Sequence, residues 1–145
     1  MKKITLLLLL INITGFSQIL EPVKWSTSTE KISETEYNLV FIATIDDNWH
    51  LYSQNVPENG PLPTVFKLKP NTNYECIGKP SEEKGIIVYE EVFDMKIKYF
   101  ETKAVFKQHI KTKHKNMFKI LGEIEFMCCD NTKCIQGYDD FEFEI

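Results

Sequence analysis

The chain has 145 residues, 43% hydrophobic and 12% aromatic, which is enough for one folded domain and too few for two ordinary ones. It carries 21 acidic and 17 basic residues, a formal net charge of −4, and every basic residue is lysine. Nucleic-acid binders usually present a basic patch and arginine side chains to phosphate, so this composition argues against that class. The apolar content excludes a disordered chain, and six glycines with six prolines exclude a collagen-like one.

Residues 1–17 have the pattern of a secretory signal peptide. A basic start at residues 1–3 is followed by an apolar run over residues 4–13 and by small residues before a cleavage point after Ser17. The run is too short for the ~20 apolar residues of a membrane span, and no cysteine follows it as a lipoprotein anchor would need. A buried N-terminal helix is the weaker alternative, because it does not explain the Lys-Lys start.

Cleavage at this point leaves a mature chain of 128 residues. It removes two lysines and no acid, so 15 basic and 21 acidic residues remain, for a net charge of −6. No other segment is long and apolar enough to span a membrane, and we expect an exported protein with no membrane span of its own. All four cysteines (Cys76, Cys128, Cys129 and Cys134) survive, so an oxidising compartment makes disulfide chemistry the first to consider.

The rest of the chain has the pattern of short strands separated by turns. Residues 56–63 contain three prolines and a glycine and are expected to form a loop. No window of helical length shows a 3.6-residue period. The pattern favours an all-β fold, a single antiparallel β-sandwich of immunoglobulin type over residues 18–145. The predicted strands are 37–45, 49–53, 64–69, 74–78, 96–100, 104–110, 119–129 and 141–145.

Three of the four cysteines lie at the end of the strand predicted over residues 119–129. Alternation along this strand places Cys128 on its apolar face, so we expect that thiol to be buried in the core. Cys129 falls on the other face, with two glutamates, and we expect it to be the more accessible thiol. Cys76 stands alone and is expected to be a buried or unpaired thiol.

Cys129 and Cys134 are separated by Asp-Asn-Thr-Lys, four polar residues that can turn the chain and bring the two sulfurs together. A bond between the vicinal Cys128 and Cys129 is disfavoured, because the ring it closes is strained. A Cys129–Cys134 bridge closes a loop of only six residues and stabilises the fold by about 2 kcal/mol. Such a bridge is a candidate for exchange chemistry and equally for a plain structural disulfide, and the spacing does not decide between them.

Local charge separates the two cysteines chemically. Thiol–disulfide exchange needs a thiolate, which Lys133 favours at Cys134 and which Asp130 disfavours at Cys129. We therefore predict that Cys134 is the attacking thiol and Cys129 the resolving one.

A metal site and a hydrolase both have weaker support. Zinc would need Cys76, His109 or His114 to converge on the cysteine turn, and no pair of these residues has a standard ligand spacing. No nucleophile–histidine–acid set is recognisable either. We expect no metal and no organic cofactor.

Three stretches of the sequence resemble the N-terminal periplasmic domain family of the thiol:disulfide interchange protein DsbD. They are Asn-Trp-His-Leu-Tyr-Ser at residues 48–53 followed by Gly-Pro-Leu-Pro-Thr at 60–64, residues 89–99, and residues 122–134 with the cysteines. With the last strand they cover about 100 residues in the same order, the size of a domain core. The resemblance implies an immunoglobulin-type sandwich in the periplasm, with a redox-active pair at Cys129 and Cys134.

The resemblance also implies roles around this pair. Cys134 would form the mixed disulfides with partners, and a cap loop over residues 89–95 would cover the cysteines until a partner docks. Phe93 is the implied cap residue, and Tyr89 and Glu91 belong to the same segment. Tyr52 and His50 are the implied aromatic wall of the site.

The sequence departs from the family in several places. Two prolines commonly follow the second cysteine in the family, whereas Cys134 is followed here by Ile-Gln-Gly, which predicts a looser exit from the turn. His50 stands where an aromatic residue is often found, and Cys128 is an extra thiol that could compete in exchange. The membrane electron carrier and the thioredoxin-like domain of the full-length family are not in this sequence, so we expect a separate membrane electron donor.

Two functional classes remain open at this point. The first is a periplasmic reductant that passes electrons from a membrane reductase to oxidised disulfide isomerases or thioredoxin-like cytochrome c maturation factors. The second is a secreted immunoglobulin-like binding module with a purely structural disulfide. A structural bridge is expected to have a reduction potential below about −300 mV, and an exchanging one a higher potential.

Overall fold

The computed structural model describes residues 20–145, so the signal peptide predicted at residues 1–17 lies outside the described residues. Every element in the described part is a strand. The strands are β1 (Val23–Lys31), β2 (Glu36–Ile45), β3 (His50–Tyr52), β4 (Val65–Leu68), β5 (Tyr74–Glu82), β6 (Ile86–Glu90), β7 (Met95–Phe100), β8 (Lys103–Thr112), β9 (Lys119–Cys129) and β10 (Cys134–Glu144).

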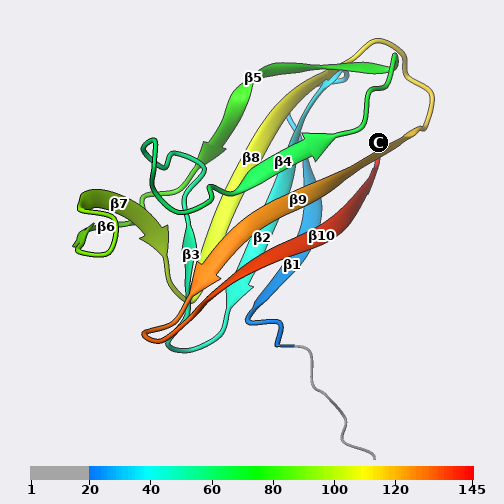
Figure 1. Ribbon diagram of the computed structural model, residues 1–145. Helices are drawn as coiled ribbons and strands as arrows, with labels where there is room; N and C mark the ends of the chain where they lie inside the picture. The colour runs from blue at the N-terminus through cyan, green and yellow to red at the C-terminus, as the bar shows by residue number, and fades with distance from the viewer. Residues whose placement is uncertain (1–19) are drawn as a thin grey trace, which may run out of the picture.

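The strands form two antiparallel sheets packed face to face (Figure 1). The first has four strands in the order β1-β2-β8-β5, and the second has six, in the order β10-β9-β3-β7-β6 with β4 also paired to β9. This architecture confirms the predicted all-β sandwich. β7 and β8 follow each other in the chain but belong to opposite sheets, so residues 101–102 carry the chain from one layer to the other.

The core lies between the sheets and is rich in aromatic rings. Every second residue of β8 and of β9 is buried, which is the two-residue period of a strand with one face inward. Phe41 of β2 is fully buried, and its ring centroid lies 4.3 Å from that of Phe66 and 4.9 Å from that of Phe141. Rings at these separations add to the gain from burial, so this cluster holds the layers together.

Two strands differ from the sequence-based prediction. β1 was not predicted, and β10 begins at Cys134 rather than near Phe141. Both strands pair along one side only, β1 with β2 and β10 with β9, so they lie at sheet edges. β1 is exposed and polar over most of its length. On the less exposed side of β10, Gly137 and Asp139 precede Phe141, so the apolar alternation that marks a half-buried strand is clear only from Phe141 on.

No helix in residues 20–145 is long and apolar enough to cross a membrane.

Candidate functional site

The turn between β9 and β10 holds the two paired cysteines. Asp130 organises it: its carboxylate accepts hydrogen bonds from the backbone N–H of Thr132 (2.7 Å) and of Lys133 (2.8 Å) and from the Thr132 hydroxyl (2.8 Å). The bonds from Thr132, together with the one from Lys133, lower the pKa of Asp130. The backbone N–H of Asp130 donates to the Lys133 carbonyl at 2.9 Å, which closes the turn.

A disulfide joins Cys129 to Cys134 across this turn, with their Cα atoms 4.0 Å apart. The two residues are partners in the β9–β10 register, which then continues without a break to Lys119 and Glu144. The looser exit expected after Cys134 is therefore wrong, because β10 starts at that cysteine.

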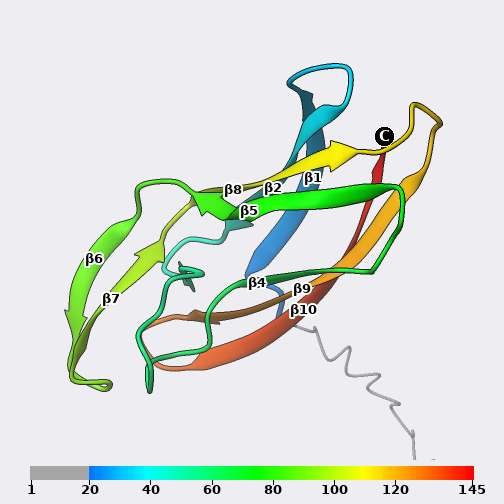
Figure 2. The ribbon, with the colours of Figure 1, turned by 90° about the horizontal axis from the view of Figure 1, so that it is seen from above.

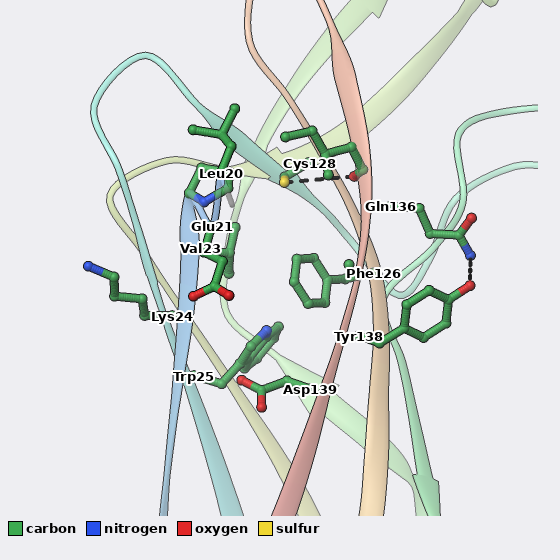
Figure 3. Close-up of a pocket in the computed structure, with 13 residues that line it drawn as sticks. Leu20, Glu21, Val23, Lys24, Trp25, Phe126, Cys128, Gln136, Tyr138 and Asp139 are labelled. Carbon is green, nitrogen blue, oxygen red and sulfur yellow. Dashed lines mark hydrogen bonds between the residues drawn. The ribbon is translucent and has the colours of Figure 1, made fainter. Parts of the chain in front are cut away.

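The neighbouring Cys128 faces the opposite side of β9. It is fully buried in the core between the sheets, as predicted, and its thiol lies 3.8 Å from the Ile135 carbonyl oxygen. Burial raises the pKa of Cys128 to about 11, so this thiol is protonated at neutral pH. Figure 3 shows it beside Phe126, at a cavity of ≈ 480 Å³ that opens between β1 and β10. The sheet itself thus separates Cys128 from the disulfide.

Cys129 is not the accessible thiol that the sequence predicted, because only 2% of it is exposed. It belongs to a second buried cluster, on the outer side of the six-stranded sheet, which we call the outer cluster. Cys134, by contrast, is exposed at the start of β10. The disulfide therefore has one covered and one accessible cysteine. The outer cluster consists of buried Tyr52, Ile97 and Cys129, with partly buried Val56, Phe93, Met95, Tyr99 and Met127 packed against them.

The segment implied as a cap is the tip of the β6–β7 hairpin. Residues 91–94 form its turn, in which the Phe93 N–H donates to the Glu90 carbonyl at 3.3 Å. Figure 2 shows this hairpin curving along one side of the sandwich, with its turn at the same end as the β9–β10 turn. Phe93 packs against the outer cluster, whereas Tyr89 is 57% exposed and Glu91 is also exposed. Of the three cap residues, only Phe93 packs against the cluster that contains Cys129.

The two implied wall residues lie on β3, directly beside the disulfide strand. His50 is the register partner of Cys129 on β9, and Tyr52 is the partner of Tyr99 on β7. The His50 Nε2 atom lies 3.2 Å from the Tyr52 hydroxyl oxygen, and its ring centroid lies 4.6 Å from that of Tyr99. Burial raises the pKa of Tyr52 to about 12 and lowers the pKa of His50. At neutral pH the phenol is protonated and the imidazole is neutral.

Sequence reasoning did not assign Ile97 and Tyr99 of β7 to the site, and it included Met95 only as the end of the cap segment. All three residues belong to the outer cluster, as does Phe93. The signal was present, because these four residues follow one another at a spacing of two, the period of one strand face. It was hidden by the lysines at positions 96 and 98, which make the stretch resemble an ordinary solvent-exposed strand.

A buried carboxylate fixes the loop that completes the outer cluster. Glu82 at the end of β5 accepts hydrogen bonds from the Ser53 hydroxyl (2.6 Å), the Gln54 backbone N–H (3.0 Å) and Lys98 Nζ (3.0 Å). Burial raises the pKa of Glu82, but these bonds outweigh it and the net effect is a lowered pKa. A Cβ on Gly60 would lie 3.1 Å from Met95 Sδ, so glycine lets this loop rest on β7.

Two further expectations concern residues away from the disulfide. Cys76 on β5 is unpaired and exposed, which agrees with the expectation of a buried or unpaired thiol. Within residues 20–145 no three His, Cys, Asp or Glu side chains lie close enough together to hold a metal ion.

The fold and the site together define a β-sandwich domain with a half-covered disulfide at one end of its larger sheet. The family model for the N-terminal domain of the thiol:disulfide interchange protein DsbD matches residues 18–144, and the chain belongs to this family. No curated protein sequence matches the chain closely enough to count as a relative.

Solved structures of other proteins are similar to this chain. The reduced DsbD N-terminal domain of Neisseria meningitidis is 19% identical, with a TM-score of 0.50 and 82% of each chain covered. The N-terminal periplasmic domain of ScsB from Proteus mirabilis is 12% identical, with a TM-score of 0.59, covering 87% of this chain and 47% of that one. A complex of the DsbD and PilB N-terminal domains from Neisseria meningitidis is 16% identical, with a TM-score of 0.49, covering 83% of this chain and 80% of that one. The first two likenesses show the fold alone.

Proposed function

We propose that this domain is a periplasmic thiol–disulfide exchange protein that passes electrons through Cys129 and Cys134 to oxidised partner proteins. The observation that carries this proposal is the asymmetry of the disulfide. Cys134 is exposed and follows Lys133, while Cys129 is covered by the outer cluster. Exchange through a mixed disulfide needs one cysteine that a partner can reach and a second, protected one that resolves the intermediate.

The reaction needs no cofactor. The Cys134 thiolate of the reduced domain attacks one sulfur of the partner's disulfide, so a Cys134–partner bond forms and the partner's second sulfur leaves as a thiolate. The Cys129 thiolate then attacks Cys134 Sγ, which forms the Cys129–Cys134 bond and releases the partner's first sulfur. The partner gains two electrons, and the protons for its two thiols come from Cys129 and Cys134.

Phe93 has a defined part in this proposal. It packs against the cluster that contains Cys129, at the tip of a hairpin rather than inside a sheet. A partner that docks at Cys134 displaces this ring. When no partner is bound, the ring shields the sulfurs from other thiols and oxidants. We infer that the cap is opened by protein partners rather than by small thiols.

Family membership and the predicted signal peptide support a proposal for the partners and the compartment. We propose disulfide isomerases or thioredoxin-like cytochrome c maturation factors as acceptors, and a separate membrane reductase as the donor. Export would follow cleavage near Ser17, which leaves a domain of residues 18–145.

A redox titration of the mature protein in dithiol buffers tests the function, with alkylation and mass mapping of each cysteine. We expect Cys129 and Cys134 to titrate together and reversibly above about −300 mV. A pair that stays bonded through that range would make the disulfide structural and the domain a binding module.

Partner trapping tests the roles of the two cysteines. We expect Cys129→Ser to accumulate mixed disulfides with partners, because the resolving thiol is absent, and Cys134→Ser to trap none. Cys76→Ser is the matched control, since that thiol is exposed but lies on the other sheet. Trapping by Cys134→Ser but not by Cys129→Ser would reverse the assignment.

A further inference from the structure

The covered position of Cys129 creates a chemical difficulty for the resolving step. Cys129 attacks as a thiolate, yet it lies 2% exposed in an apolar cluster and beside the carboxylate of Asp130. Burial in apolar surroundings and a nearby negative charge both raise the pKa of a thiol. A resolving thiol in this position needs a nearby group that takes its proton.

The backbone register places one such group next to it. His50 and Cys129 are paired residues of β3 and β9, and paired residues of antiparallel strands project from the same face of the sheet. Their Cβ atoms are therefore about 4.5–5.5 Å apart. The next pair, Leu51 and Cys128, projects to the opposite face and is fully buried in the core. His50 on β3 therefore projects from the same face of the sheet as Cys129 on β9.

The imidazole is held in a fixed orientation. Its Nε2 atom lies 3.2 Å from the Tyr52 hydroxyl oxygen, and its ring lies against that of Tyr99. In the tautomer that donates from Nε2 to Tyr52, the Nδ1 atom is a free proton acceptor.

The charges around His50 favour a transient positive charge on the ring. Burial lowers its pKa, so the imidazole is neutral at pH 7, whereas Glu90, Glu101 and Asp130 act in the opposite direction. The phenol rings of Tyr52 and Tyr99 lie beside the imidazole, and Asp46 and Asp47 line the same hollow as His50. His50 also lines an open polar hollow of ≈ 600 Å³ together with Asn131 of the cysteine turn, and this hollow gives a proton a route to water.

We propose that His50 accepts the proton of the Cys129 thiol in the resolving step, an inference that rests on the disulfide exchange proposed above. The thiol proton moves to Nδ1, and the Cys129 thiolate attacks Cys134 Sγ. The Cys129–Cys134 bond forms, the Cys134–partner bond breaks, and the electron pair of the broken bond stays on the partner's sulfur. The imidazolium then releases its proton to that thiolate or to water, so the atoms and charges balance.

The test uses an aromatic disulfide as the partner. Reduced Cys76→Ser protein is mixed with 5,5′-dithiobis(2-nitrobenzoate), and release of the coloured thiolate is followed by stopped flow from pH 6 to pH 10. The first release, by Cys134, depends on reagent concentration. The second release, by Cys129, does not, and mass mapping of the product identifies the bond formed.

We expect the second phase to rise with pH through an inflection below about 8.5, the ordinary pKa of a thiol. In His50→Gln we expect this phase to be about tenfold slower at pH 7, equivalent to one pKa unit, and to approach the parent rate at pH 10. His50→Phe, which restores the aromatic residue common in the family, is expected to behave like His50→Gln. It keeps the test valid if the glutamine variant does not fold. His109→Gln on β8 is the matched control and is expected to leave both phases unchanged.

The outcomes separate this inference from the proposed function. If the parent protein shows no second phase, the exchange function itself fails. If the parent shows it and His50→Gln has the same rate at every pH, exchange stands and the role of His50 is overturned. An equal slowing at all pH values would make His50 a positioning residue only and would also overturn the proton transfer.

Discussion

The core between the sheets and the outer cluster over the disulfide are closed in different ways. The core is enclosed by two sheets, and its central residues, such as Phe41 and Phe106, are fully buried. The outer cluster has only three buried residues, and the partly buried residues packed against them come from a hairpin tip, one loop, β7 and β9. Cys128 and Cys129 are adjacent in sequence, yet each belongs to a different one of these clusters.

The core between the sheets is therefore expected to determine the stability of the fold, and the outer cluster the reactivity of the disulfide. The fully buried core contributes most of the free energy of folding, because that gain scales with the apolar area removed from water. The outer cluster removes less area and can be opened without separating the sheets. Variants of the two clusters are therefore expected to change different measurements.

The largest effect on stability is expected from the core. Phe41→Ala removes a fully buried ring that lies against Phe66 and Phe141, and we expect it to lower the free energy of unfolding by about 3–5 kcal/mol. Urea unfolding followed by tryptophan fluorescence measures this loss. Thr44→Ala, an exposed position on the same strand, is the control and is expected to change stability by less than about 0.5 kcal/mol. A comparable loss in both variants would contradict a core centred on Phe41.

An intermediate effect is expected from the carboxylate that fixes the loop beside the outer cluster. Glu82→Gln weakens the bonds to Ser53, Gln54 and Lys98, and we expect a loss of about 2 kcal/mol at pH 7. Glu83→Gln, an exposed neighbour, is the control.

The same carboxylate predicts a dependence on pH. Because the pKa of Glu82 is lower in the folded protein than its ordinary value of 4.5, its contribution is complete above that value and disappears as the pH falls through the folded pKa. Unfolding experiments between pH 7 and pH 3 are expected to show that the free energies of unfolding of the parent protein and of Glu82→Gln converge as the pH falls. A difference in free energy of unfolding that stays constant with pH would show that the Glu82 carboxylate does not cause it.

The smallest effect on stability, and the clearest on reactivity, is expected at the cap. Phe93→Ala removes a partly buried ring, and we expect a loss of only about 1 kcal/mol. The rate at which dithiothreitol reduces the Cys129–Cys134 bond is expected to rise by about tenfold, because access to the sulfurs limits exchange. Val92→Ala changes a residue of the same turn that is 86% exposed and is the matched control. Equal rates in the two variants would show that Phe93 does not protect the bond.

Sequence patterns predicted what depends on neighbours in the chain. The alternation over residues 119–129 placed Cys128 inside the core, and the polar residues after Cys129 indicated a turn. The burial of Cys129 was not predictable in this way, because β3, β7 and the hairpin tip that cover it come from 30 or more residues earlier. β1 was missed for a related reason, since an edge strand exposed on most of its length carries little apolar signal.

The disulfide closes a ring of six residues at the end of a long ladder. Cys129 and Cys134 are the terminal pair of eleven between β9 and β10, so breaking their bond leaves the other ten pairs in place. The oxidised and reduced forms are then expected to have the same outline. A partner would then meet nearly the same surface in both forms, and it could distinguish the oxidised from the reduced domain only by contact with the two sulfur atoms.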